Sequence, residues 1–154
     1  MIIMGQSLSQ LYVHLTFGTK YREPLINQAD EERLHSYMAG ILKNLESPAL
    51  IINSVPDHVH ILFRLSKNHA LAKVVEEVKK QSSKWIKEIG KGYLTFSWQP
   101  GYGAFSLSSR AVEIVRKYIS NQKRHHRTKS YVEELERLFR ECGVIEFDPE
   151  YYWR

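Results

Sequence analysis

The chain has 154 residues, 43% of them hydrophobic, and a formal net charge of +5 from 22 Lys and Arg against 17 Asp and Glu. This length and composition predict a single domain over residues 1–154, and the mild basic excess is compatible with a polyanionic partner. A single cysteine excludes an internal disulfide and a cysteine-based zinc site, while the absence of a signal-peptide pattern or a membrane-length apolar run favours a cytoplasmic protein with no membrane partner.

The first half of the chain predicts a strand, a helix and a hairpin. In residues 11–17, LYVHLTF, apolar side chains on one face alternate with Tyr12, His14 and Thr16 on the other, as in a half-buried strand. Asn27 is a candidate cap for an amphipathic helix that follows it. Residues 48–55 and 58–65 are strand-like runs separated by a Pro-Asp turn, which predicts a β-hairpin.

A second amphipathic helix and a fourth strand are predicted next. Apolar residues recur at helical spacing from Leu71 to Ile89, and Gly90 is a natural stop. The aromatic and glycine-rich run 93–105 is interpreted as strand and loop, leading to a short strand near residues 104–108.

Two more helices are predicted after this strand. Ser108 or Ser109 caps the first, whose sequence is RAVEIVRKYISNQ. The last begins with a capping box, Ser130-Tyr131-Val132-Glu133. Its apolar stripe includes Cys142, which we interpret as an inert thiol of the core.

The predicted element order is β-α-β-β-α-β followed by two helices. This order is typical of an α+β fold, the ferredoxin-like split βαβ arrangement, with an antiparallel sheet and both crossover helices on one face. In strand 58–65 the side chains of His58 and His60 share one face, and the apolar residues Val59 and Ile61 take the other. We therefore expect the histidine face to be the open one, shared with His14.

Two spacings point to chemistry, although each is weak alone. Two imidazoles two strand residues apart are separated at their origins by roughly 7 Å, close enough to converge on one ion. Tyr118 and Gln122 lie at i and i+4 and so are neighbours on one helical face. Periodicity alone favours the structural interpretation, in which Tyr118 extends the packing stripe and Gln122 is a polar end cap.

Six short motifs follow one another along nearly the whole chain. They are VHLTFGTKYREPL (13–25), DHVHIL (57–62), KKQSSKWI (79–86), WQPGYGAFS (98–106), YISNQ (118–122) and HHR (125–127). In this order they resemble the single-tyrosine HUH transposases of small bacterial insertion sequences, the IS200/IS605-like group. HUH denotes two histidines around a hydrophobic residue, matched here by His58-Val59-His60.

The resemblance implies a reaction and a set of residues for it. In such enzymes the tyrosine, here Tyr118, attacks single-stranded DNA at hairpin-marked element ends and forms a 5′-phosphotyrosine link. His58, His60 and Gln122 would hold the metal, Mg²⁺ or Mn²⁺. Two imidazoles and an amide suit softer ions than Mg²⁺, so we expect Mn²⁺ to bind more tightly. The alternatives for His14 are a contribution to the deprotonation of the tyrosine and a neutral surface role, of which we expect the second.

The resemblance also implies a homodimer, because joining two DNA ends requires two tyrosines. In the family the tyrosine helix can dock in the partner's site, and the sequence leaves assembly in cis or in trans open. Such enzymes act on single-stranded DNA as transposases, by metal-dependent cleavage and strand transfer.

Basic residues near these motifs are candidate DNA contacts. Cations after the tyrosine helix are explained equally well by the dipole at the helix C-terminus. Beside a phosphate-cleaving site, contact with DNA phosphates becomes the favoured interpretation. The candidates are Lys20, Arg22, Lys79, Lys80, Lys84, Arg116, Lys123, Arg124 and Arg127.

Other functions stay open at this point. One is a domesticated HUH nuclease that acts on dispersed palindromic repeats, and another is a replication initiator, for whose fused helicase the chain is short. A third is a non-catalytic module that binds single-stranded nucleic acid, since RNA-recognition modules share the split βαβ sheet. A hydrolase that uses only the histidines would keep its activity in Tyr118→Phe.

Overall fold

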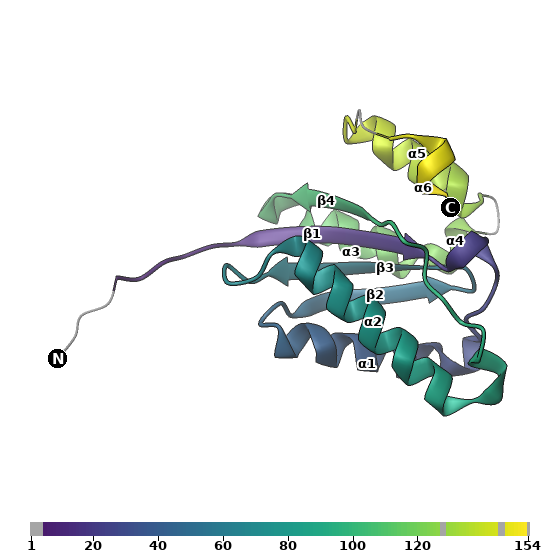
Figure 1. Cartoon of the computed structure of the whole chain (residues 1–154). Helices are drawn as coiled ribbons and strands as arrows, with labels where there is room; N and C mark the ends of the chain where they lie inside the picture. Colours follow the sequence, from purple (N-terminus) through teal and green to yellow (C-terminus); the bar gives the residue numbers. More distant parts are fainter. Residues whose placement is uncertain (1–4, 127–128, 145–146, 154) are drawn as a thin grey trace.

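A four-stranded antiparallel sheet forms the centre of the computed structural model, which describes residues 5–126, 129–144 and 147–153 (Figure 1). The strands are β1 (Leu11–Gly18), β2 (Ala49–Val55), β3 (His58–Leu65) and β4 (Gly103–Leu107). Their order in the sheet is β2-β3-β1-β4, and every pair is antiparallel. This is the split βαβ order, so the predicted fold class is confirmed.

The two crossover helices cover one face of the sheet, as predicted. They are α1 (Glu31–Asn44) and α2 (Leu71–Ile89), which pack against each other. Alternate residues of the central strands, such as Phe17, Val59 and Ile61, meet apolar residues of both helices in one buried cluster. Burial of this face fixes the strand register, because a shift by one residue would turn the apolar set to the other side.

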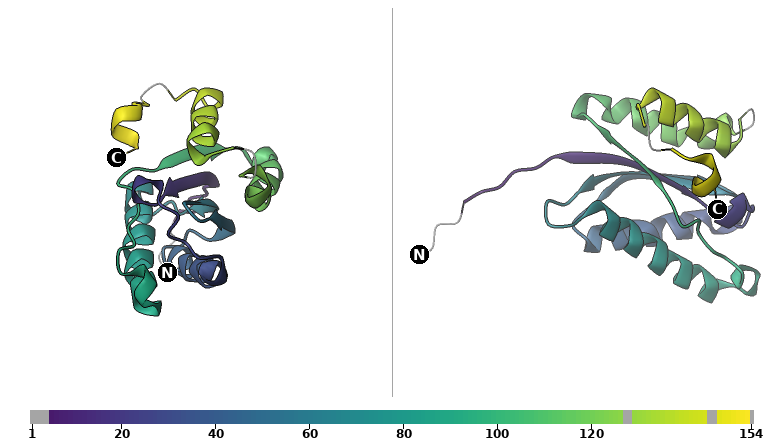
Figure 2. Two further views of the ribbon diagram at one scale, coloured as in Figure 1. Left: turned by 90° about the vertical axis from the view of Figure 1, so that its right-hand side faces the viewer. Right: turned by 45° about the horizontal axis from the view of Figure 1, so that its top comes forward.

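The opposite face, expected to be open, is covered by the C-terminal part of the chain. Helices α3 (Val112–Ser120) and α4 (Gln122–His125) lie over β2 and β3. Helix α5 (Tyr131–Glu141) packs beside them on β1 and β4, and α6 (Pro149–Tyr152) follows. Figure 2 shows the sheet between the α1/α2 layer and this second layer. The expectation of an open face was wrong because α5 carries its own apolar stripe, which this face buries.

A second buried cluster holds α5 in place. Phe105 of β4 lies in this cluster with Tyr131, Leu135 and Phe139 of the helix, and the Phe105 and Phe139 rings are 5.8 Å apart between centroids. One half of the predicted capping box is confirmed, because the Ser130 hydroxyl accepts a hydrogen bond from the Glu133 N–H at 3.2 Å. Cys142, by contrast, is exposed at the C-cap, so its assignment to the core was wrong.

Several element ends differ from the predicted ones. Short 3₁₀ turns lie at Lys20–Arg22, Gln28–Asp30, Lys91–Tyr93 and Ser109–Ala111. The second and the fourth occupy positions that were predicted as helix starts. The Asn27 side chain caps no helix, and α1 begins only at Glu31. The run 93–105 contributes only an isolated bridge between Thr19 and Trp98 before β4.

The largest difference is a break in the predicted tyrosine helix. It stops being helical at Asn121, where φ is −97° and ψ is 17°, and resumes as α4. No proline or glycine marks this position in the sequence. Within the described residues, no helix combines the length and apolar character that crossing a membrane requires.

Candidate active site

His58 and His60 lie side by side on β3 and point toward the second helical layer. Both side chains are fully buried, because α3, α4 and α5 close over this face. Their rings are 5.2 Å apart between centroids. The prediction that the two imidazoles share a face is therefore confirmed.

The Nδ1 atom of each ring contacts a further side chain, which fixes the orientation of the ring. The Nδ1 of His58 lies 2.7 Å from Oδ1 of Asp57, and the Nδ1 of His60 lies 2.8 Å from Nε2 of His14. Partners at Nδ1 leave the Nε2 atoms of both rings facing the same interior point, as metal-ligating histidines require. The expectation that His14 is a surface residue was wrong, because the ring is buried against His60.

Tyr118 and Gln122 reach the same point from the second helical layer. The hydroxyl of Tyr118 donates a hydrogen bond to Oε2 of Glu134, and Oε1 of Gln122 lies 3.3 Å from Nε2 of His58. Gln122 is fully buried and is not an end cap. The side chains converge despite the break at Asn121, because the Asn53 amide donates at 2.9 Å to the Ile119 carbonyl and anchors the end of α3.

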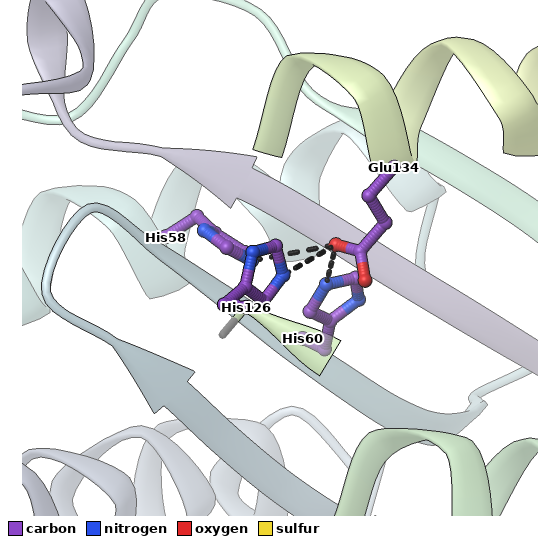
Figure 3. A group of neighbouring side chains, drawn as sticks. All are labelled: His58, His60, His126 and Glu134. Carbon is purple, nitrogen blue, oxygen red and sulfur yellow. Dashed lines mark hydrogen bonds and ion pairs between the residues drawn. The ribbon is translucent and has the colours of Figure 1, made fainter. Parts of the chain in front are cut away.

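Glu134 and His126 complete the cluster. Oε1 of Glu134 lies 2.8 Å from Nε2 of His60, 3.4 Å from Nε2 of His58 and 3.2 Å from Nε2 of His126. Figure 3 shows the three rings turned toward this carboxylate. Sequence reasoning missed Glu134, although a signal was present: it is a carboxylate between Tyr131 and Leu135 on the inward stripe of the last helix.

The buried environment shifts the ionisation of these groups strongly. Burial lowers the pKa of His14 to about 3 and that of His60 to about 4, so both rings are neutral near pH 7. Burial also opposes charge on His58 and Glu134. Hydrogen bonds with Asp57 and Glu134 nevertheless raise the pKa of His58, and hydrogen bonds from the histidines lower the pKa of Glu134.

The phenol of Tyr118 is held in its protonated form by its surroundings. Burial and the negative charge of Glu134 both raise the pKa of its hydroxyl well above the ordinary value for tyrosine. A phenolate at this position therefore needs a nearby positive charge.

The side chain of Tyr131 packs between α5 and the histidines. Its ring stacks on that of His58, with centroids 3.9 Å apart and planes at 14°. The hydroxyl of Thr16 donates to the Val59 carbonyl at 2.9 Å, so the Tyr131 hydroxyl, 3.0 Å away, donates to Thr16. This contact fixes where α5 meets the sheet and so where Glu134 lies.

The donor atoms of this cluster fit a divalent metal ion. One ligand atom each from His58, His60, His126 and Glu134 lie within 4.8 Å of one another. The Gln122 oxygen adds a further donor, 3.1 Å from Nε2 of His126. Imidazole nitrogens with carboxylate and amide oxygens are ligands that Mn²⁺ and similar ions accept.

The candidate DNA contacts are distributed over both layers. Lys80 and Lys84 are exposed on α2, across the sheet from the histidines, and Lys80 pairs with Glu77 at 3.0 Å. The Lys79 side chain forms hydrogen bonds within the protein, because its ammonium donates to the carbonyls of Gln99 and Gly101 at 2.7 and 2.6 Å.

The remaining candidates lie nearer the cluster. Lys20 and Arg22 are exposed just after β1, where Gly18 pairs with His58. Arg116 and Arg124 are exposed on α3 and α4, and Lys123 forms a 2.6 Å ion pair with Glu31. Arg127 lies outside the described residues.

Comparison with known proteins gives one consistent result. Residues 7–122, about three quarters of the chain, match the family model described as transposase, IS200-like. The sequence is 24% identical over 121 residues to the ISDra2 transposase TnpA of Deinococcus radiodurans, which covers 73% of this chain and 84% of that protein.

Two solved structures share the fold. One is a chain of Deinococcus radiodurans R1 assigned as a transposase, with a TM-score of 0.61 and 21% identity, covering 79% of this chain and 98% of the other. The second is a REP-associated tyrosine transposase bound to a REP hairpin, with a TM-score of 0.60 and 15% identity, covering 82% and 74%. At these identities the two structures support the fold alone.

Proposed function

The chain belongs to the IS200-like transposases, and from this premise we propose that it cleaves and rejoins single-stranded DNA through Tyr118. The observation that carries the proposal is the convergence of the Tyr118 hydroxyl with His58, His60 and Gln122 around one buried point. Burying several polar side chains around one point costs folding free energy. A module that only binds nucleic acid would not need this arrangement.

In the proposed reaction Tyr118 is the nucleophile. Its phenolic oxygen forms a bond to the scissile phosphorus as it loses its proton, and the bond from phosphorus to the 3′ oxygen breaks. The products are a 5′-phosphotyrosine link and a free 3′-OH, which takes up a proton. Because the link conserves the phosphodiester energy, a 3′-OH of another strand can reverse the step and rejoin DNA.

His58, His60 and Gln122 would hold the metal ion, Mg²⁺ or Mn²⁺. When bound, the ion polarises a phosphate oxygen and offsets the negative charge that develops in the transition state. The chain itself supplies the orientation: Asp57 and His14 turn the two rings, and burial excludes bulk water.

The tyrosine and the histidines of one chain already lie together, which supports assembly in cis. A homodimer stays part of the proposal, because two DNA ends require two nucleophiles. Lys20, Arg22, Lys84, Arg116 and Arg124 are the proposed phosphate contacts, since their side chains are exposed.

Hairpin DNA is the proposed substrate. One relative in fold is bound to a REP hairpin, which supports a structured single strand as the ligand. The same likeness favours a second candidate function, in which the chain is a domesticated nuclease for palindromic repeats. Both functions use Tyr118, and only the source of the cleaved hairpins separates them.

The test is covalent capture. Purified protein is incubated with Mn²⁺ and 3′-end-labelled single-stranded hairpins from the flanks of its gene, and the products are separated on a denaturing gel. We expect a labelled band at the size of protein plus DNA, which disappears in Tyr118→Phe and persists in the control Tyr12→Phe. Cleavage without this band would indicate a hydrolase, and binding with neither cleavage nor adduct would indicate a binding module.

A further inference from the structure

We propose that Glu134 is a protein ligand of the metal ion, which it binds through Oε1 while it holds the Tyr118 hydroxyl through Oε2. The inference rests on the proposed function, because it concerns the same metal site. It adds a negatively charged donor from α5 to the neutral donors His58, His60 and Gln122.

The ring N–H groups of His58 and His126 point away from the cluster. The Nδ1 of His126 lies 2.7 Å from the Lys129 carbonyl, and that of His58 lies 2.7 Å from the Asp57 carboxylate, so both nitrogens donate outward. In the neutral imidazole, the form that binds a metal ion, the other nitrogen then carries a lone pair in place of the proton that it shares with Glu134 in the protonated form. The Nε2 lone pairs of both rings therefore face the interior of the cluster.

The lone pairs of the two rings face further acceptor atoms. The Gln122 amide donates its own N–H to Oε2 of Glu134 at 3.2 Å, which leaves its oxygen turned to the rings. Four acceptor atoms thus face one another: Nε2 of His58 and of His126, and Oε1 of Gln122 and of Glu134. Acceptors repel one another unless a cation, or additional protons, lies between them.

The separations are those of neighbouring ligands on one ion. The four edges of this ring of acceptors measure 3.3, 3.4, 3.1 and 3.2 Å. Ligand atoms at about 2.0–2.2 Å from a common metal are about 3.0–3.5 Å apart in octahedral or tetrahedral arrangements. The His60 nitrogen, 2.8 Å from Oε1 of Glu134, lies beside the same ring.

The charge of Glu134 also resolves a chemical mismatch. Two imidazoles and an amide form a neutral donor set that favours softer ions over Mg²⁺ or Mn²⁺. A carboxylate oxygen is the ligand those harder ions prefer, and it offsets part of their charge in a buried site. Through Oε2 the same carboxylate places the nucleophile at the edge of the metal site.

The test is the affinity for Mn²⁺ alone, measured by titration calorimetry without DNA. Glu134→Gln keeps the size of the side chain and removes its charge, and Glu136→Gln makes the same change on the same helix as a control. We expect Mn²⁺ binding to weaken roughly tenfold or more in Glu134→Gln and in His58→Ala, and to stay within twofold of wild type in Glu136→Gln. Thermal melts of each metal-free variant report whether the fold is retained, and Glu134→Asp provides a second carboxylate that should recover part of the affinity.

Two other results have distinct meanings. In one of them, His58→Ala loses Mn²⁺ binding but Glu134→Gln binds Mn²⁺ as well as wild type, or better. Glu134 then only occupies the space near the ion and is not a ligand, and the proposed function stands without this inference. If the wild-type protein binds no Mn²⁺, or if binding does not depend on His58, both the inference and the proposed metal site are overturned.

Discussion

His14 Nε2 lies 2.8 Å from His60 Nδ1, so a histidine of β1 sets the orientation of a ring on β3. The two residues are on neighbouring strands, and Thr16, not His14, is the direct partner of His60 in the register. The long imidazole of His14 spans this diagonal. Both rings are buried and have lowered pKa values, so both are neutral. One ring therefore donates its N–H in a hydrogen bond to the bare nitrogen of the other.

The change His14→Leu should therefore weaken Mn²⁺ binding at the proposed metal site, although it removes none of the proposed ligands. It leaves Nδ1 of His60 without its partner, which frees the ring to rotate and costs about 1–3 kcal/mol of folding free energy. We expect Mn²⁺ affinity in calorimetry to fall roughly tenfold. His69→Leu, remote from the cluster, is the matched control, and equal affinities in the two variants would contradict a positioning role for His14.

Asn53 is the second positioning residue that the structure indicates. Its amide donates to the carbonyls of Ile119 and Ser120 at 2.9 and 3.4 Å, directly after Tyr118. Asn53→Ala should lower the free energy of unfolding by about 1 kcal/mol and slow formation of the covalent adduct by roughly tenfold or more, because Tyr118 loses its anchor. Asn68→Ala, which removes a surface amide, should change neither quantity. A normal adduct rate in Asn53→Ala would show that α3 is held in place by packing alone.

The fold was predictable because its patterns are local. The alternation in 58–65 assigns His58 and His60 to one face without ambiguity. The helical spacing from Leu71 to Ile89 predicts both ends of α2 correctly. The glycine after Ile89 and the Pro-Asp turn have conformational preferences that mark the ends of these elements.

The rest depended on packing between distant parts of the chain. Glu134 enters the site because α5 docks across β1, and its partner His60 is 74 residues earlier in the sequence. The break at Asn121 has no signal of its own, since it is stabilised by Asn53 from another element. His14 looked like a surface residue because the helices that bury its face could not be placed from periodicity.

Tyr131 tests how firmly α5 is held against the histidines. Its ring is fully buried on His58 and its hydroxyl bonds Thr16. Tyr131→Phe removes only the hydroxyl and should cost about 1 kcal/mol, whereas Tyr131→Ala leaves a cavity and should cost about 3–5 kcal/mol in urea unfolding. Tyr37→Phe on α1 serves as the control, within about 0.5 kcal/mol of wild type. Nearly equal losses for Phe and Ala at position 131 would mean that the helix relaxes onto the sheet.

Lys79, which the sequence predicts to be a DNA contact, has a structural role as the alternative. The Lys79 ammonium donates to three carbonyls, those of Gln99, Pro100 and Gly101, and so ties the segment before β4 to α2. Lys79→Met should lower the free energy of unfolding by about 2 kcal/mol, because charged hydrogen bonds are lost, while the exposed Lys80→Met should cost less than about 1 kcal/mol. Neither the affinity for single-stranded DNA nor its dependence on salt should change in Lys79→Met. A fall of about 0.7 in the slope of log K against log salt, with stability unchanged, would instead assign this ammonium to a DNA phosphate.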